Sequence, residues 1–336
     1  MRRLKLEVRT ERLRLAAPFR ISGHVFEHCD VIVATLDDGT HIGRGEAAGV
    51  YYLGDDVPGM TATIERARGE IEAGIERVAL QRLLPPGGAR NALDCALWEL
   101  EAAQSGQPVW KLAGAVAPRP LMTTFTLGAD DPAVMAEGAR GYADARAIKV
   151  KLTGELALDL DRVRAIRAAR GDVWLGVDAN QGFGRRDLDA LVAGLAEQEV
   201  ALLEQPLARG AEADLDGYRS AIPIAADESA LSLADLPGLV GRFDVVNIKL
   251  DKCGGLTEGL AMAARARQLG LGVMVGNMVG TSLAMAPGFV LGQFCDVVDL
   301  DGPAFLAEDR APSVVYRDGL IDCGEQVWGG PGRLAA

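Results

Sequence analysis

The sequence predicts an α/β fold, a barrel of parallel strands and helices that follows a smaller α+β segment. After about residue 120, short apolar runs recur at steps of 22 to 27 residues, and a helix-like segment follows each run. A parallel strand needs a crossover of about a dozen residues or more, usually a helix, so this spacing fits repeated βα units. Eight such runs favour a barrel over an open sheet. The runs end near Phe125, Lys151, Asp178, Glu204, Asp227, Lys249, Gly276 and Asp301.

The first part of the chain has a different pattern. Apolar residues alternate with polar ones in residues 4–8 and 31–36, which predicts two strands of an antiparallel sheet. Helical patterns follow at 60–76 and 89–104, the second with an apolar stripe. We therefore divide the chain into an α+β domain over residues 1–116, a barrel over 117–310 and a C-terminal segment over 311–336.

Composition limits the partners and the compartment. The formal net charge of −12 argues against a nucleic-acid partner. Five cysteines, odd in number, far apart and without a CxxC pair, are typical of reduced thiols in the cytoplasm. Residues 269–294 carry no charge, but glycine, asparagine and proline interrupt them. We expect a buried strand, a loop and a helix there, and no membrane span.

Three carboxylates suggest a metal site. Asp178, Glu204 and Asp227 each follow an apolar strand, in three consecutive units. The C-terminal ends of barrel strands form one rim, so the three side chains should converge. Converging carboxylates repel one another unless a cation lies between them, and hard oxygen ligands favour Mg²⁺, or Mn²⁺ as a substitute. A helix-capping role is the alternative for each acid taken alone.

Three lysines accompany these acids. Lys149 and Lys151 stand at i and i+2 of one predicted strand, so both point to the same face, and Lys249 ends a run across the barrel. Burial and a nearby metal should lower the pKa of such a lysine, which could then act as a general base. Exposed lysines on an edge strand are the alternative, and the central place of this run in the repeat argues against it.

This set of residues suits removal of a proton α to a carboxylate, because a divalent cation stabilises the resulting enediolate. Two lysines on opposite faces of the α-carbon allow removal on one side and return on the other, as epimerisation requires. An elimination needs one base and a leaving group, and it stays open. Asp299 and Asp301 end the eighth run and suit a substrate ammonium group, with a turn before Gly302 as the alternative.

Together these motifs resemble the enolase superfamily, in its muconate-lactonising subgroup, and most closely its dipeptide epimerases of the L-Ala-D/L-Glu type. The resemblance covers nearly the whole chain. It is carried by residues 90–98, 149–151, 178–180, 204–207, 227–229, 247–255 and 299–303.

The resemblance implies a (β/α)₇β modified TIM barrel with an N-terminal α+β capping domain that closes over the rim. It implies that the three carboxylates bind Mg²⁺ and that Lys151 and Lys249 are the acid–base pair. Lys149 would tune its neighbour and contact the substrate carboxylate, and Asp299 and Asp301 would hold the ammonium group of a dipeptide. The C-terminal segment would return to the capping domain, and homo-oligomers are common in the family.

One loop departs from the pattern. Ala-Glu epimerases carry an arginine after the Pro-Phe pair that meets the glutamate side chain, and Gly23 stands there in this chain. Arg20 and His24 are the loop residues that we expect to contact the substrate. Another proton abstraction, such as that of a cycloisomerase or an o-succinylbenzoate synthase, is the nearest alternative, and the aspartate pair argues against it. A non-catalytic barrel is the third interpretation, and the completely filled set of site positions argues against that.

Overall fold

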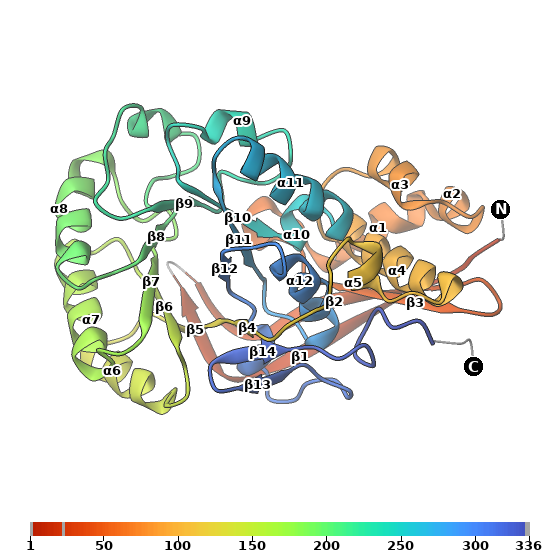
Figure 1. The fold of residues 1–336 in the computed structure, drawn as a ribbon, viewed down its shortest axis with the longest axis horizontal. Helices are drawn as coiled ribbons and strands as arrows, with labels where there is room; N and C mark the ends of the chain where they lie inside the picture. Colours follow the sequence, from red (N-terminus) through yellow and green to blue (C-terminus); the bar gives the residue numbers. More distant parts are fainter. Residues whose placement is uncertain (1–2, 22–23, 333–336) are drawn as a thin grey trace.

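The computed structural model describes residues 3–21 and 24–332, and it contains a nearly closed barrel of eight parallel strands (Figure 1). The strand order is β12-β11-β10-β9-β8-β7-β6-β5, so strands that are consecutive in sequence lie side by side. The strands are β5 (Thr124–Leu127), β6 (Ala147–Lys151), β7 (Trp174–Asp178), β8 (Leu202–Glu204), β9 (Ile224–Ala226), β10 (Val245–Lys249), β11 (Gly272–Gly276) and β12 (Val297–Val298). The predicted barrel is confirmed, and five of its strands end at the predicted residue.

Helices cover the outside of the barrel, as βα crossovers require (Figure 1). They are α6 (Pro132–Gly141), α7 (Leu156–Ala169), α8 (Arg185–Ala196), α9 (Leu236–Leu239), α10 (Leu250–Cys253), α11 (Leu256–Gln268) and α12 (Ser282–Gly292). The uncharged stretch 269–294 forms β11, a loop and α12, as predicted. Within the described residues, no helix combines the length and the apolar character that crossing a membrane needs.

The N-terminal part is an antiparallel sheet in the order β1-β2-β3, packed against helices. Its elements are β1 (Lys5–Ile21), β2 (His24–Asp37), β3 (Ile42–Ala47), η1 (Tyr51–Leu53), α1 (Val57–Arg66), α2 (Arg68–Glu72), α3 (Arg77–Leu83), α4 (Gly88–Ser105) and α5 (Val109–Leu112). The single helix expected over 60–76 is wrong. The chain breaks at Ala67, whose N–H donates to Ile64 O in a tight i−3 bond, and Gly69, a poor helix former, follows.

Close packing of β3 on α4 shapes this N-terminal sheet. A Cβ atom added to Gly43 would lie 1.9 Å from Ala96 O, and one added to Gly45 would lie 2.0 Å from Ala92 O. Only glycine therefore lets the strand approach the helix backbone to backbone. Figure 1 shows the long hairpin of β1 and β2 extending from this sheet toward the barrel strands.

Side chains close the gap between the first and last barrel strands. Thr124 Oγ1 donates to Asp299 Oδ1 over 2.5 Å, and Thr126 N–H donates to Asp301 Oδ2 over 2.7 Å. Leu300 N–H returns a hydrogen bond to Thr123 Oγ1 over 2.9 Å. The strand predicted to reach Asp301 therefore ends at Val298, because side chains take over the pairing from there.

The last residues contact the N-terminal sheet. Strand β13 (Val315–Arg317) pairs with β14 (Leu320–Asp322), which in turn pairs with β4 (Leu121–Met122). Beyond them, Trp328 Nε1 donates to Arg44 O over 2.9 Å, and an Arg44 guanidinium nitrogen donates to Val327 O over 2.8 Å. We retain the limits 1–116, 117–310 and 311–336 as our proposed domain division.

Candidate active site

Three carboxylates meet at the C-terminal rim of the barrel. Asp178 ends β7, Glu204 ends β8, and Asp227 directly follows β9. Asp178 and Glu204 are register partners, so they stand at the same height on adjacent strands. One oxygen atom from each of the three lies within 4.8 Å of the others. All three side chains are buried, as predicted from the alignment of strand ends.

The donor set fits a hard divalent cation. Carboxylate oxygens at this spacing, without a sulfur or imidazole in the group, are the ligands that Mg²⁺ prefers. Burial and the neighbouring Asp178 raise the pKa of Glu204 to about 7, which shows how strongly the buried negative charges repel one another. Asn180 Oδ1 is also buried at this place and lacks a hydrogen-bond partner among the described residues. A cation among these oxygens would reduce the repulsion between the carboxylates and would give Asn180 Oδ1 a partner.

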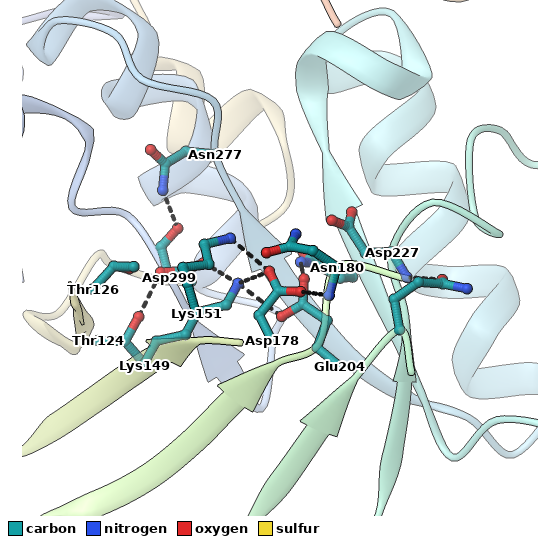
Figure 2. Close-up of polar contacts among 12 residues, drawn as sticks. Thr124, Thr126, Lys149, Lys151, Asp178, Asn180, Glu204, Asp227, Asn277 and Asp299 are labelled. Atoms are coloured by element: carbon teal, nitrogen blue, oxygen red, sulfur yellow. Dashed lines mark hydrogen bonds and ion pairs between the residues drawn. The ribbon is translucent and has the colours of Figure 1, made fainter. Parts of the chain in front are cut away.

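Two of the predicted lysines lie on one flank of the carboxylates (Figure 2). Lys151 Nζ lies 2.6 Å from Asp178 Oδ2. Lys149 Nζ lies 2.7 Å from Glu204 Oε2 and 2.8 Å from Asp299 Oδ2. Both side chains point to the same face of β6, because they stand two residues apart on a strand.

Lys249 lies on the opposite flank. It ends β10, which is separated from β6 by the three strands that position the carboxylates. Its Nζ atom lies 2.7 Å from Asp227 Oδ2. The two candidate bases, Lys151 and Lys249, therefore approach the cluster from different sides.

The carboxylates raise the pKa values of Lys249 and Lys149, and the lowering expected of a lysine beside a bound metal stays a prediction. Burial lowers the pKa of Lys249, but Asp227 and Glu204 outweigh that effect and raise it well above its ordinary value. The same holds for Lys149, where Asp299 and Glu204 outweigh burial. In both cases the close pairing of the ammonium group with a carboxylate sets the direction of the shift in pKa.

Sequence analysis assigned no site role to Lys252, which contacts a member of the cluster. Its side chain is buried, and its Nζ donates to Asp227 Oδ1 over 2.5 Å, to Asp227 O over 2.5 Å and to Asn247 O over 3.0 Å. All three ammonium hydrogens are therefore used. The available signal was its place one helical turn after Lys249, in α10.

Two amides also orient the carboxylates and were missed. Asn247 Nδ2 donates to Glu204 Oε1 over 2.8 Å. Gln205, fully buried, accepts the N–H of Asp227 at its Oε1 over 2.9 Å and donates from Nε2 to Leu207 O over 2.9 Å. The signal for Asn247 was its position two residues before Lys249, on the same strand face.

Asp299 and Asp301 line the cavity but differ in their contacts. Asp299 uses one oxygen for Thr124 and the other for Lys149. Asp301 uses Oδ2 for the N–H of Thr126, while its Oδ1 lies 3.5 Å from Asn277 Nδ2. Burial and the adjacent Asp299 raise the pKa of Asp301 to about 6. Asp301 is therefore the member of the pair with the more available oxygen.

A cavity of about 450 Å³ lies above these residues, between the barrel rim and the capping sheet. Both lysines of the candidate pair and both aspartates line it. Arg20 and His24 belong by their backbones to the hairpin of β1 and β2, where Arg20 pairs with Val25 and His24 with Ile21. The side chains of Arg20 and His24, and Gly23 as a whole, lie outside the described residues.

Comparisons with known proteins agree with this geometry. Residues 134–331 match the family model described as Enolase C-terminal domain-like. L-Ala-D/L-Glu epimerase of Escherichia coli (strain K12) is 39% identical over 309 residues, which cover 91% of this chain and 96% of that protein. N-acetyl-D-glutamate racemase of Pseudoalteromonas sp is 41% identical over 260 residues, which cover 76% of this chain and 81% of that protein.

Solved structures give the same result. An enolase family member from Agrobacterium tumefaciens with homology to dipeptide epimerases, bound to sodium and L-Ala-L-Glu, matches with a TM-score of 0.92 and 40% identity over 97% of this chain and 100% of that one. The dipeptide epimerase from Methylococcus capsulatus, complexed with Mg and L-Arg-D-Lys, matches with a TM-score of 0.91 and 29% identity over 100% of both chains. This chain therefore belongs to the enolase superfamily and is an isomerase within it, of the epimerase and racemase kind.

Proposed function

We propose that this protein is a Mg²⁺-dependent dipeptide epimerase that inverts the α-carbon of the C-terminal residue by proton transfer between Lys151 and Lys249. One observation carries the proposal. Two lysines, the buried Lys249 and the partly buried Lys151, flank a cluster of three carboxylates from opposite sides, separated by the strands that hold the cluster. A substrate carboxylate at the cluster would place its α-carbon between the two ammonium groups.

Asp178, Glu204 and Asp227 are the residues that would hold the metal. When bound, Mg²⁺ would neutralise the substrate carboxylate and stabilise the negative charge of an enediolate. Asn247 and Gln205 hold the metal ligands by hydrogen bonds, directly for Glu204 and through the backbone for Asp227. The carboxylates thus keep their orientation without the substrate.

The lysines divide the proton transfer between them. One, as the neutral amine, takes the α-proton from its face and becomes an ammonium group. The other, as an ammonium group, gives a proton to the opposite face of the same carbon and becomes neutral. Each direction of the reaction exchanges these two roles, so the net change is inversion with no proton gained or lost.

Three further residues would bind the substrate. Lys149, already held by Glu204 and Asp299, would contribute positive charge beside the substrate carboxylate. Asp301, through its more available oxygen, and Asp299 would accept the N-terminal ammonium group of the dipeptide. An ammonium group matches the available oxygen of Asp301, whereas an N-acyl group would leave that buried carboxylate without a cation.

Deuterium incorporation tests the proposal. The full-length protein is incubated in D₂O with Mg²⁺ and a panel of L-Ala-L-X dipeptides, including L-Ala-L-Glu, beside the matching N-acetyl-L-X compounds. We expect deuterium at the α-carbon of X, together with formation of the L,D diastereomer, and faster exchange for the dipeptides. Absence of exchange with every dipeptide would sink the proposal. Faster exchange with the N-acetyl compounds would keep the proton transfer and reject the ammonium site.

Metal binding at the three carboxylates is tested by a measurement that does not depend on activity. Binding of Mn²⁺, followed by its electron paramagnetic resonance signal, should reveal one site in the native chain. The E204Q variant should weaken that site by at least about tenfold, because one charged ligand is lost. Unchanged Mn²⁺ binding in this variant would show that Glu204 is not a ligand.

A further inference from the structure

An aromatic wall lines the part of the cavity that the capping part of the chain provides. Phe26, from β2, contacts Tyr51 edge to face with ring centroids 5.4 Å apart. Tyr51 in turn contacts Tyr52 edge to face with centroids 5.3 Å apart. All three rings line the cavity. We define these three residues as the aromatic roof.

Other apolar side chains extend this surface, and they come from both parts of the chain. Val57 and Pro58 begin α1 beside the roof, and Met278 and Val279 follow β11 at the barrel rim. The cavity is therefore polar where the chemistry would occur and apolar on the side that the capping sheet provides. Such division is usual in sites that fix a reacting group at one end and bury a side chain at the other.

Charges near the roof are negative. Asp30, Asp55 and Asp56 line the cavity from the capping part of the chain. Asp30 is already paired with Arg12 over 2.8 Å, and Asp56 caps the N-terminus of α1. Among the described lining residues, the basic ones are His28 and the three lysines at the barrel rim, and carboxylates already pair with those lysines.

These observations decide which side chain fits. The substrate carboxylate takes the metal end, the α-carbon lies between the lysines, and the ammonium group takes the aspartates. With these three groups placed, the side chain of the inverted residue would point toward the aromatic roof. A glutamate side chain there would bring a charge beside aromatic rings and aspartates, whereas an apolar one would exchange water for ring contacts.

We propose that the aromatic roof selects dipeptides whose C-terminal residue carries an apolar or aromatic side chain, and that Phe26 is a specificity-determining residue. This inference rests on the proposed epimerase function. Tyr52 adds one refinement. Its hydroxyl oxygen is buried and has no hydrogen-bond partner among the described residues, so it can hydrogen-bond an uncharged polar side chain such as that of glutamine.

The test compares four dipeptides in the D₂O assay with Mg²⁺: L-Ala-L-Leu, L-Ala-L-Phe, L-Ala-L-Gln and L-Ala-L-Glu. We expect kcat/KM for the leucine and phenylalanine compounds to exceed that for the glutamate compound by at least about tenfold, as burial of one apolar side chain provides. The glutamine compound, which has nearly the same shape as glutamate without its charge, should fall between them. A glutamate compound that is exchanged fastest overturns the inference and leaves epimerisation standing.

Two variants locate the effect. F26A should raise KM for L-Ala-L-Phe by about tenfold with a smaller change in kcat, because a ring contact is lost at the binding end and not at the α-carbon. F26R should shift preference toward L-Ala-L-Glu, because it supplies a positive charge within the aromatic roof. V25A is the matched control, since Val25 is the neighbouring residue and its side chain is 56% exposed. An unchanged order of substrates in both Phe26 variants would reject Phe26 as the selecting residue.

Discussion

Lys252 donates two hydrogen bonds to Asp227, one of 2.5 Å to its side-chain Oδ1 and one of 2.5 Å to its backbone carbonyl oxygen. Lys249 meets the other carboxylate oxygen, Oδ2, over 2.7 Å. Two lysines one helical turn apart therefore share one aspartate, and they differ in their other contacts. Lys252 has no hydrogen left to give, whereas Lys249 lines the cavity.

The first prediction concerns the hydrogen bonds from Lys252 to Asp227. K252M should weaken Mn²⁺ binding by about tenfold or more and lower the rate of deuterium exchange, because Asp227 loses the contact that fixes its orientation. It should also lower the free energy of unfolding by roughly 2 kcal/mol, since the buried Asp227 carboxylate loses one of its two lysine partners. Metal binding is measured by paramagnetic resonance, and stability by urea unfolding. K111M, at an exposed lysine, is the control. Normal Mn²⁺ affinity in K252M would reduce Lys252 to a purely structural residue.

The second prediction separates the two candidate bases. K151A and K249A should each lose epimerisation by a factor of about 10² to 10⁴, as expected for removal of a general base or acid. Each variant should retain exchange without inversion for one diastereomer only, and the retained diastereomer should differ between the two variants. The remaining lysine can still remove and return a proton on its own face. Nuclear magnetic resonance of L,L and L,D dipeptides in D₂O measures this. Loss of the same diastereomer in both variants would contradict a two-sided mechanism.

The third prediction follows from Asp251, which joins the barrel to the capping sheet. Its Oδ1 accepts the N–H groups of Ala48 and Gly49, each over 3.0 Å, and burial raises its pKa to about 7. Between about pH 4 and pH 7 the unfolded chain ionises at this residue while the folded chain keeps the proton. Stability should therefore fall as the pH rises through that window, by up to about 4 kcal/mol, and level off above it.

D251N removes this ionisation and keeps an oxygen for both N–H groups. We expect its unfolding free energy to be less dependent on pH between 4 and 7 than that of the native chain. Urea unfolding at several pH values measures the difference. D144N, at an exposed aspartate, should leave the slope unchanged. Parallel pH profiles for the native chain and D251N would show that Asp251 ionises normally in the folded protein.

The fourth prediction tests the close packing in the capping sheet. G45A should lower the free energy of unfolding by at least about 2 kcal/mol, because its methyl group would lie 2.0 Å from Ala92 O and the helix must move away. G69A is the control. Gly69 is helical and a Cβ atom there would meet nothing within 4 Å, so alanine should be neutral or stabilising. Equal stability of the two variants would mean that β3 and α4 adjust without cost.

The sequence was sufficient for the barrel and for the convergence of its functional groups, because both depend on local patterns. Apolar runs mark the strands, and the residue that ends each run faces the rim. Lys151, Asp178, Glu204 and Lys249 were placed in this way, and each ends a strand. The i, i+2 spacing of Lys149 and Lys151 likewise required only the alternation of a strand.

What could not be predicted depends on contacts between distant segments. The aromatic roof needs Phe26 of the hairpin to meet Tyr51, and no periodicity relates these two residues. The raised lysine pKa values depend on distances of less than 3 Å to specific carboxylates. The break at Ala67 was missed because the apolar pattern continues through it. Each miss is a tertiary effect that a reading along the chain does not contain.

The side-chain contacts that join β5 and β12 affect which substitutions the protein can accept. The hydrogen bond between Thr124 and Asp299 joins the first and last barrel strands, and Asp299 also accepts a hydrogen bond from Lys149 beside the cavity. A substitution at Asp299 that suits a new substrate would also loosen the wall that holds the catalytic groups. We therefore expect substitutions at Phe26 to disturb the barrel less than substitutions at Asp299, because Phe26 lies in the hairpin outside the barrel strands.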